Sequence, residues 1–207
     1  MEYALLRSLR ALGPGLLILS YVDLFRVLAL HDKSYFWSLE SAKLFLLGYA
    51  VGGIYGVIAN LLKRDTYAFK SVTDAISTAL REFAPEIDGR SWNDISPCYY
   101  TLIDNDKSLE QKSKGMYFNG FIVTTSFDAI WLSLIAAVFG ATIALLESEW
   151  EFLAISATSV TVAYMIWLAS NARHRELALE QVNVIGRRFE KDFRDCLGRA
   201  SCETKTP

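Results

Sequence analysis

The sequence has few of the residues from which catalytic and metal centres are built. It contains two histidines and three cysteines. The histidines, His31 and His174, lie in segments that we expect on opposite sides of a membrane, so neither a His-pair metal site nor a Ser-His-Asp triad is easily assembled. The cysteines are odd in number and lack CxxC spacing, which argues against a disulfide framework or a zinc site and favours reduced, incidental thiols. They are Cys98, Cys196 and Cys202.

Two further motifs are incomplete. The glycine-rich run at residues 52–56 is not a phosphate-binding loop, because it lies in an apolar segment and no Lys-Ser or Lys-Thr follows it. Asp104 and Asp106 resemble the start of a calcium loop, but the later Gly and Glu of that loop are missing, so an acid-rich turn is the better interpretation. We therefore expect a protein that is not an enzyme and that binds no metal and no cofactor.

Apolar residues are abundant instead. They make up 52% of the chain, and the mean hydropathy is +0.23, which is high for a soluble domain. With 21% charged residues the chain is also too polar to be wholly embedded, so we expect membrane helices together with a water-soluble part. The net charge of -2 gives no general case for nucleic-acid binding, which usually shows as a basic surface.

Four apolar segments are close to the roughly 20 residues that a helix needs to cross a bilayer. These expected spans are 11–30, 44–62, 120–146 and 152–169. The sequence predicts an all-α integral membrane protein, a bundle of four transmembrane helices with cytosolic helical segments. It divides into a first transmembrane pair, a cytosolic insertion, a second transmembrane pair and a cytosolic C-terminal helix with its tail, at residues 1–62, 63–119, 120–169 and 170–207.

Lysine and arginine beside the spans predict the orientation, because they accumulate on the cytoplasmic side. Arg7 and Arg10 precede the first span, Lys63 and Arg64 follow the second, and four arginines follow Ala169 before residue 189. These segments all belong inside if both termini are cytoplasmic. A three-span alternative, with residues 1–30 on the membrane surface, would force the N-terminal arginines outside.

The polar segments carry helical and turn signals. Apolar residues spaced by three and four over 69–83 predict an amphipathic helix that Pro85 ends. Residues 86–114 predict turns and at most one short strand at 99–103. The fourth span runs on without a helix breaker, which predicts one long rod into the C-terminal segment. Near the start of the chain, residues 13–15 read Gly-Pro-Gly and are expected to bend or begin the first helix.

Small residues mark a packing face on the second span. Gly48, Gly52 and Gly56 recur at every fourth position, which makes a narrow groove along one side of a helix. Close packing of small residues is a main source of helix association in lipid. The groove therefore serves either packing within one subunit or an interface between subunits, including one that lines a pore.

Three ionisable residues lie within the expected spans, where each costs at least ~2.5 kcal/mol on insertion scales. They are Asp23, Arg26 and Asp128. One arginine could reach both acids if the first and third spans are neighbours. Two interpretations follow: a polar lining for a channel, proton relay or gate, or a buried ion pair that fixes helix register.

A basic run occupies the C-terminal segment. Its four members are interleaved with acids, which is typical of a solvated helix with internal ion pairs. The alternatives are a site for anionic lipid, nucleotide or nucleic acid, or a docking surface for a cytosolic partner protein. The four residues are Arg187, Arg188, Lys191 and Arg194.

In the layout of its spans and cytosolic segments, the chain resembles small four-span membrane components of bacterial antiphage systems, such as the Kiwa membrane subunit and four-span effectors encoded beside oligonucleotide-signalling enzymes. The resemblance implies antiviral defence at the inner membrane and carries over no functional residue. We expect a non-enzymatic, oligomeric sensor or effector, channel-like in one form, with the lipid bilayer, further copies of itself (a tetramer as working number) and a cytosolic protein as partners. The alternatives are a small transporter or membrane-embedded enzyme that uses the three intramembrane ionisable residues, and a scaffold.

Overall fold

The computed structural model describes residues 2–29, 33–147 and 150–203, and over these residues it is helical with no strand. The chain forms two compact units. Unit 1 consists of Met1–Ala68 and Phe121–Ala169, and unit 2 consists of Phe69–Gly120 and Ser170–Pro207. The all-α prediction is confirmed for the described residues.

Within the described residues, four helices are long and apolar enough to cross a membrane: α1 (Glu2–Ala29), α2 (Ser41–Leu61), α6 (Lys107–Glu147) and α7 (Glu151–Arg188). Large apolar side chains on them remain exposed, for example Leu46, Val138 and Met165. Exposed apolar surface of this extent is what lipid covers. The chain therefore has the features of a multi-span membrane protein, while the orientation of its termini stays a prediction. The acid-rich connection between the last two spans, at residues 147–151, lies partly outside the described residues.

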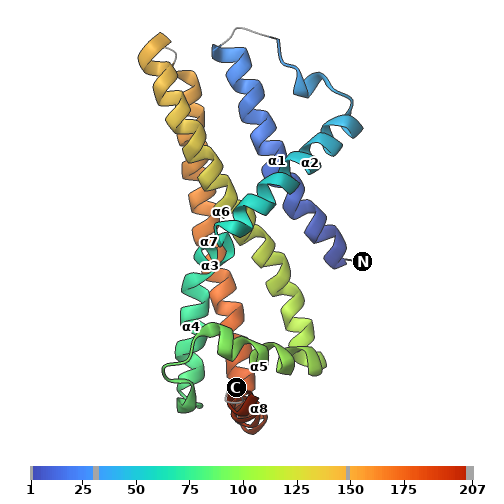
Figure 1. The fold of residues 1–207 in the computed structure, drawn as a ribbon, viewed down its shortest axis with the longest axis vertical. Helices are drawn as coiled ribbons and strands as arrows, with labels where there is room; N and C mark the ends of the chain where they lie inside the picture. Colours follow the sequence, from blue (N-terminus) through green and yellow to red (C-terminus); the bar gives the residue numbers. More distant parts are fainter. Residues whose placement is uncertain (1, 30–32, 148–149, 204–207) are drawn as a thin grey trace. The chain divides into compact units, whose positions relative to one another are not determined.

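Helices α1 and α2 cross in close contact within unit 1 (Figure 1). A Cβ added to Gly15 would lie 1.8 Å from the Gly48 carbonyl oxygen, and one added to Gly52 would lie 1.7 Å from the Ala11 carbonyl oxygen. Glycine is thus required on both helices for the backbones to approach. The expectation that the Gly-Pro-Gly cluster bends or begins the first helix is wrong about the start, because α1 begins at Glu2 and holds Pro14 in its interior.

Unit 2 has its own apolar core, to which α4 (Lys70–Arg81), α5 (Trp92–Asn105) and α8 (Glu190–Glu203) contribute. The predicted amphipathic helix corresponds to α4, and the 3-10 turn η2 (Pro85–Ile87) follows it. The ends of α6 and α7 complete the core. Its fully buried large side chains are Leu80, Ile87, Ile95, Tyr99, Leu109, Val182, Ile185, Phe193 and Leu197.

The prediction of turns and a short strand over 86–114 is wrong. A capping box begins α5, in which the Ser91 hydroxyl and backbone N–H donate to the Asp94 carboxylate at 2.7 and 3.1 Å. These bonds lower the pKa of Asp94. Ile95, Tyr99 and Ile103 then recur at four residues and are buried, so the β-branched and aromatic piece packs as one face of a helix.

Asp106 has a structural role between α5 and α6. Its carboxylate accepts hydrogen bonds from the Ser108 hydroxyl, from the Ser108 N–H at 2.9 Å and from the Leu109 N–H at 3.0 Å. These bonds lower the pKa of Asp106, with the Ser108 hydroxyl as the main cause. The acid-rich turn is therefore the start of α6, capped by one of its acids.

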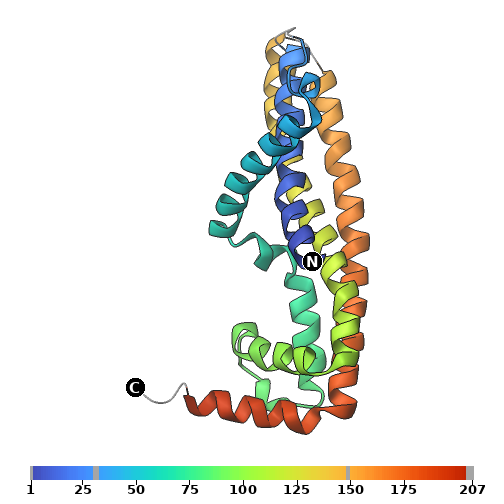
Figure 2. The same ribbon diagram turned by 90° about the vertical axis from the view of Figure 1, so that its right-hand side faces the viewer.

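The predicted rod is continuous as α7 but ends at Arg188, and Phe189 separates it from α8. Figure 2 shows α8 turning away from the end of α7. Cys98 of α5 and Cys196 of α8 form a disulfide, with Cα atoms 5.8 Å apart. The prediction of incidental thiols is wrong for these two, because 98 residues separate them in sequence and only the folding of α5 against α8 brings them together.

Candidate functional site: a buried charge network in unit 1

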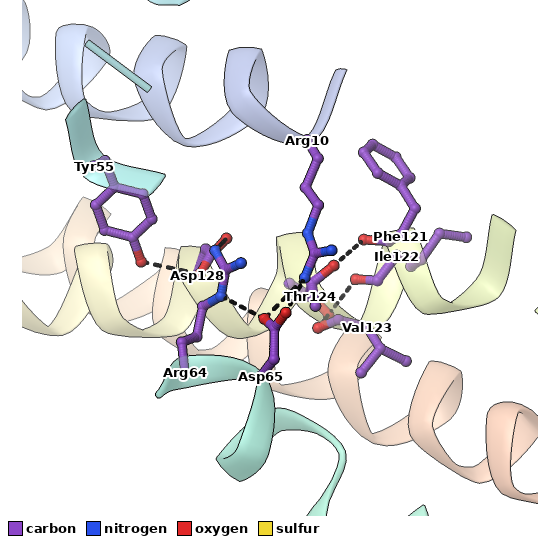
Figure 3. A network of polar contacts seen from close by, with 10 residues as sticks. Arg10, Tyr55, Arg64, Asp65, Phe121, Ile122, Val123, Thr124 and Asp128 are labelled. Carbon is purple, nitrogen blue, oxygen red and sulfur yellow. Dashed lines mark hydrogen bonds and ion pairs between the residues drawn. The ribbon is translucent and has the colours of Figure 1, made fainter. Parts of the chain in front are cut away.

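Asp128 is the most buried ionisable side chain of the candidate site, at 1% exposed. It lies on α6, and both of its carboxylate oxygens are occupied (Figure 3). The Arg64 guanidinium donates to Oδ2 at 2.7 Å, and the Tyr55 hydroxyl donates to Oδ1 at 3.0 Å. Three helices therefore meet at one carboxylate: α2 through Tyr55, α3 (Arg64–Ala68) through Arg64, and α6 through Asp128.

The network continues from Arg64 toward solvent. Arg64 Nε donates to Asp65 at 2.9 Å, and Asp65 also accepts two hydrogen bonds from Arg10 of α1 at 2.8 and 2.9 Å. The side chains of Arg64 and Asp65 are 10% and 49% exposed. Two positive and two negative charges alternate, so the network as a whole is neutral.

Lys63, a residue with a left-handed backbone conformation, positions Arg64. Helix α2 ends at Leu61, the Leu62 and Lys63 N–H groups bond back to Ile58 and Asn60, and Lys63 has a φ of 52°. A residue in this conformation after a helix reverses the chain direction and is most often glycine. The turn lets α3 begin at once and place Arg64 against α6 rather than along the axis of α2.

Replacing Lys63 with valine is expected to destabilise the protein by about 1–2 kcal/mol relative to glycine at the same position, because only glycine adopts positive φ without a steric cost. The measurement is an unfolding titration of the two full-length variants in mixed detergent micelles. Equal stability of Lys63→Gly and Lys63→Val would mean that the turn does not persist in the folded protein.

The geometry suits a structural clamp better than a reactive or conducting group. A buried carboxylate is tolerated when it is paired and its lone pairs are used, and removal of one partner is then costly. Asp128 meets this condition through Arg64 and Tyr55. Among the described residues, no group of three or more His, Cys, Asp or Glu side chains is arranged to hold a metal ion.

Asp23 and Arg26 lie at a different place from Asp128. The Asp23 carboxylate, 2% exposed, accepts hydrogen bonds from the Ser34 hydroxyl and from the Tyr35 and Phe36 N–H groups, the latter two at 2.8 and 3.2 Å. The Arg26 guanidinium lies 5.6 Å from the centre of the Tyr35 ring. These residues hold the connection between α1 and α2, and Arg64 takes the place at Asp128 that we had considered for Arg26.

The glycine groove is divided between two environments. Gly48 and Gly52 face α1 within the same chain. A Cβ added to Gly56 would meet no atom within 4 Å, so this residue leaves room on the surface of α2. The close approach that the sequence predicted is therefore made inside one subunit at the first two positions.

The basic run of the C-terminal segment is also divided. Arg194 donates to the Phe83 carbonyl oxygen and pairs with Glu190 at 2.9 Å and Glu86 at 3.6 Å. The other three, Arg187, Arg188 and Lys191, are exposed, as Arg194 itself is. Arg194 thus links α8 to the segment that follows α4.

Sequence reasoning missed Tyr55 and Arg64 as partners of Asp128. Arg64 had been interpreted only as a mark of orientation, since it directly follows the second span. The available signal was its position within one helical turn of the span end, from which a long side chain can reach back into the apolar layer. Nothing in the spacing singled out Tyr55 from the other aromatic residues.

Comparisons with protein-family models, with curated proteins and with solved structures found no match.

Proposed function

We propose that the chain is a non-enzymatic membrane sensor or effector, in which the Asp128 network couples the membrane helices to the chain that enters unit 2. The observation that carries the proposal is the 2.7 Å pair between Arg64 of α3 and the buried Asp128 of α6. Arg64 is the first residue of the short α3, and unit 2 begins at Phe69, directly after this helix. A change in the position of α6 that breaks the pair releases α3, and with it the start of unit 2.

Hydrogen exchange of the full-length protein in lipid nanodiscs tests this coupling. Asp128→Asn removes the charge partner of Arg64, so we expect faster exchange in α3 and in α4, which follows it. The matched control is Asp23→Asn, which removes another buried carboxylate from a span but should affect only the connection at residues 33–40. Unchanged exchange of α4 in Asp128→Asn would contradict the coupling role.

The same geometry argues against Asp128 as an ion-pathway residue. Its carboxylate is buried and both oxygens are occupied, whereas a pathway residue faces water. We expect vesicles reconstituted with the native protein to show no ion flux above that of empty vesicles. Flux that disappears in Asp128→Asn would overturn this and favour the transporter alternative.

Homo-oligomer formation stays a prediction. Of the glycines on α2, Gly56 tests it better than Gly52. Gly52 contacts α1 of its own chain, so a large side chain there disturbs the subunit itself. Gly56→Leu is the better probe, because its surroundings are open and a loss of mass in light scattering would then report on a subunit contact.

The antiviral setting rests on the layout resemblance alone. Its test is the plating efficiency of phages on cells that carry the native gene with its neighbours, compared with the same cells carrying Asp128→Asn. Equal plating on the native strain and on an empty strain would remove this part of the proposal.

A further inference from the structure

Two features of unit 2 conflict if its disulfide is permanent. Cys98 and Cys196 are bonded, and Cys98 is 1% exposed in the core of the unit. Yet lysines and arginines flank the spans where the chain enters unit 2 in sequence, which predicts that this unit faces the cytoplasm. Thiols are kept reduced there, and the cytoplasmic disulfides that do form are usually transient and redox-sensing or catalytic.

We propose that Cys98 and Cys196 form a reversible redox modification site, which holds α8 against α5 of the same unit when oxidised and frees it when reduced. The reductant is a dithiol and the oxidant is a small disulfide such as oxidised glutathione. The inference is independent of the role proposed for Asp128, since it concerns α5 and α8 only.

The two cysteines differ in solvent exposure, and this difference decides which sulfur an external thiol attacks first. Cys196 is partly exposed, whereas Cys98 is buried. A thiolate of the dithiol attacks the Cys196 Sγ, the Cys98–Cys196 bond breaks, and the Cys98 sulfur leaves as a thiolate and takes a proton. The second thiol of the dithiol then attacks the mixed disulfide and releases Cys196. The protein gains two electrons and two protons, and the dithiol becomes a disulfide.

Oxidised glutathione returns the protein to the bonded form. Two cysteine thiols give up two electrons and two protons, and one oxidised glutathione becomes two molecules of glutathione. The bond that forms is again the one between Cys98 and Cys196.

Helix α8 is held in unit 2 by one apolar face, by the contacts of Arg194 with Phe83 and Glu86, and by the disulfide. It follows α7 after a single residue, Phe189. Phe193 and Leu197 bury its apolar face, with the Phe193 ring 6.0 Å from that of Phe83. Arg90 donates to the Leu197 carbonyl oxygen at 3.3 Å, which is a long bond. The disulfide is the covalent link that holds this face in place.

Hydrogen exchange of the full-length protein, measured after reduction by dithiothreitol and after reoxidation by oxidised glutathione, tests the proposal. Reduction should lower the protection of α8 amides by roughly 30-fold or more, as expected when a cross-link closing a long loop is lost, while α4 keeps most of its protection. Cys98→Ser should resemble the reduced native protein in every buffer. Cys202→Ser, which alters the third cysteine, should respond to glutathione as the native protein does.

Two results would overturn the inference. One is equal protection of α8 in the oxidised and reduced native protein, a comparison that does not depend on the folding of any variant. The other comes from maleimide trapping of thiols in intact cells: a bond that is complete under reducing growth would identify a permanent cross-link. The expected trapping result is free Cys98 and Cys196 during ordinary growth and their bonding after oxidant treatment.

Discussion

Replacing Asp128 with alanine is expected to lower the free energy of unfolding of the full-length protein by about 3 kcal/mol, the lower end of the range for breaking a buried pair, since the Arg64 guanidinium loses its buried partner and keeps only the half-exposed Asp65. The Arg64 side chain is only 10% exposed, so water does not replace the lost carboxylate. The Tyr55 hydroxyl loses its acceptor in the same variant. Unfolding in mixed micelles, followed by tryptophan fluorescence, measures the loss.

Asp65 supplies the control for this variant. It belongs to the same network, but its side chain is 49% exposed, and exposed ion pairs contribute only about 0–1 kcal/mol. Asp65→Ala should therefore cost much less than Asp128→Ala. Equal losses in the two variants would mean that burial does not decide the strength of this network.

Replacing Gly52 with alanine is expected to separate α1 from α2 and to cost about 3 kcal/mol or more, the upper part of the range for overpacking. The added methyl group would lie 1.7 Å from the Ala11 carbonyl oxygen and 2.7 Å from its carbon. These are backbone atoms, so no side chain can rotate away to make room. A thermal unfolding series in detergent measures the effect.

Gly53→Ala is the matched control, one residue further along the same helix. A Cβ at this position would meet no atom within 4 Å. Alanine there should be neutral or stabilising by up to about 1 kcal/mol, the usual difference between alanine and glycine in a helix. Similar destabilisation by both substitutions would contradict the close approach of α1 and α2.

The apolar spans could be predicted because length and hydropathy are local properties. Segments of about 20 apolar residues produce a strong signal, and each of the four expected spans falls on a helix of membrane length. The residues that these helices contact on one another could not be predicted in the same way. The glycines of α2 indicated a close contact, but the residues that receive it, Ala11 and Gly15, are known only from the crossing of the two helices.

The helix α5 was missed because two signals competed. Tyr99–Ile103 is rich in aromatic and β-branched residues, which favours a strand in isolation. The Ser91 and Asp94 capping box and the burial of Ile95, Tyr99 and Ile103 favour a helix, and tertiary packing decided the outcome. A count of apolar positions over the whole of 92–105 would have favoured the helix.

Of the residues in the candidate site, the sequence predicted Asp128 but not its partners Arg64 and Tyr55. Asp128 stood out as an acid within an apolar span, and a buried ion pair was one of the two interpretations offered for it. The partner differed from the one considered, because the turn at Lys63 directs Arg64 toward α6. A single positive φ at a lysine leaves no pattern in a sequence, so this part could come only from the structure.

The most direct test of the central claim is a double-mutant cycle between Arg64→Met and Asp128→Leu, measured as the free energy of unfolding of the full-length protein. If the two side chains form the buried pair that holds α3 on α6, Arg64→Met leaves the buried Asp128 without its charge partner and Asp128→Leu leaves Arg64 with only the half-exposed Asp65, while the double variant removes both charges. The account predicts a coupling energy of about 2–3 kcal/mol, with the double variant more stable than either single one. Effects that add to within about 0.5 kcal/mol would show that Arg64 and Asp128 act independently and would contradict the account.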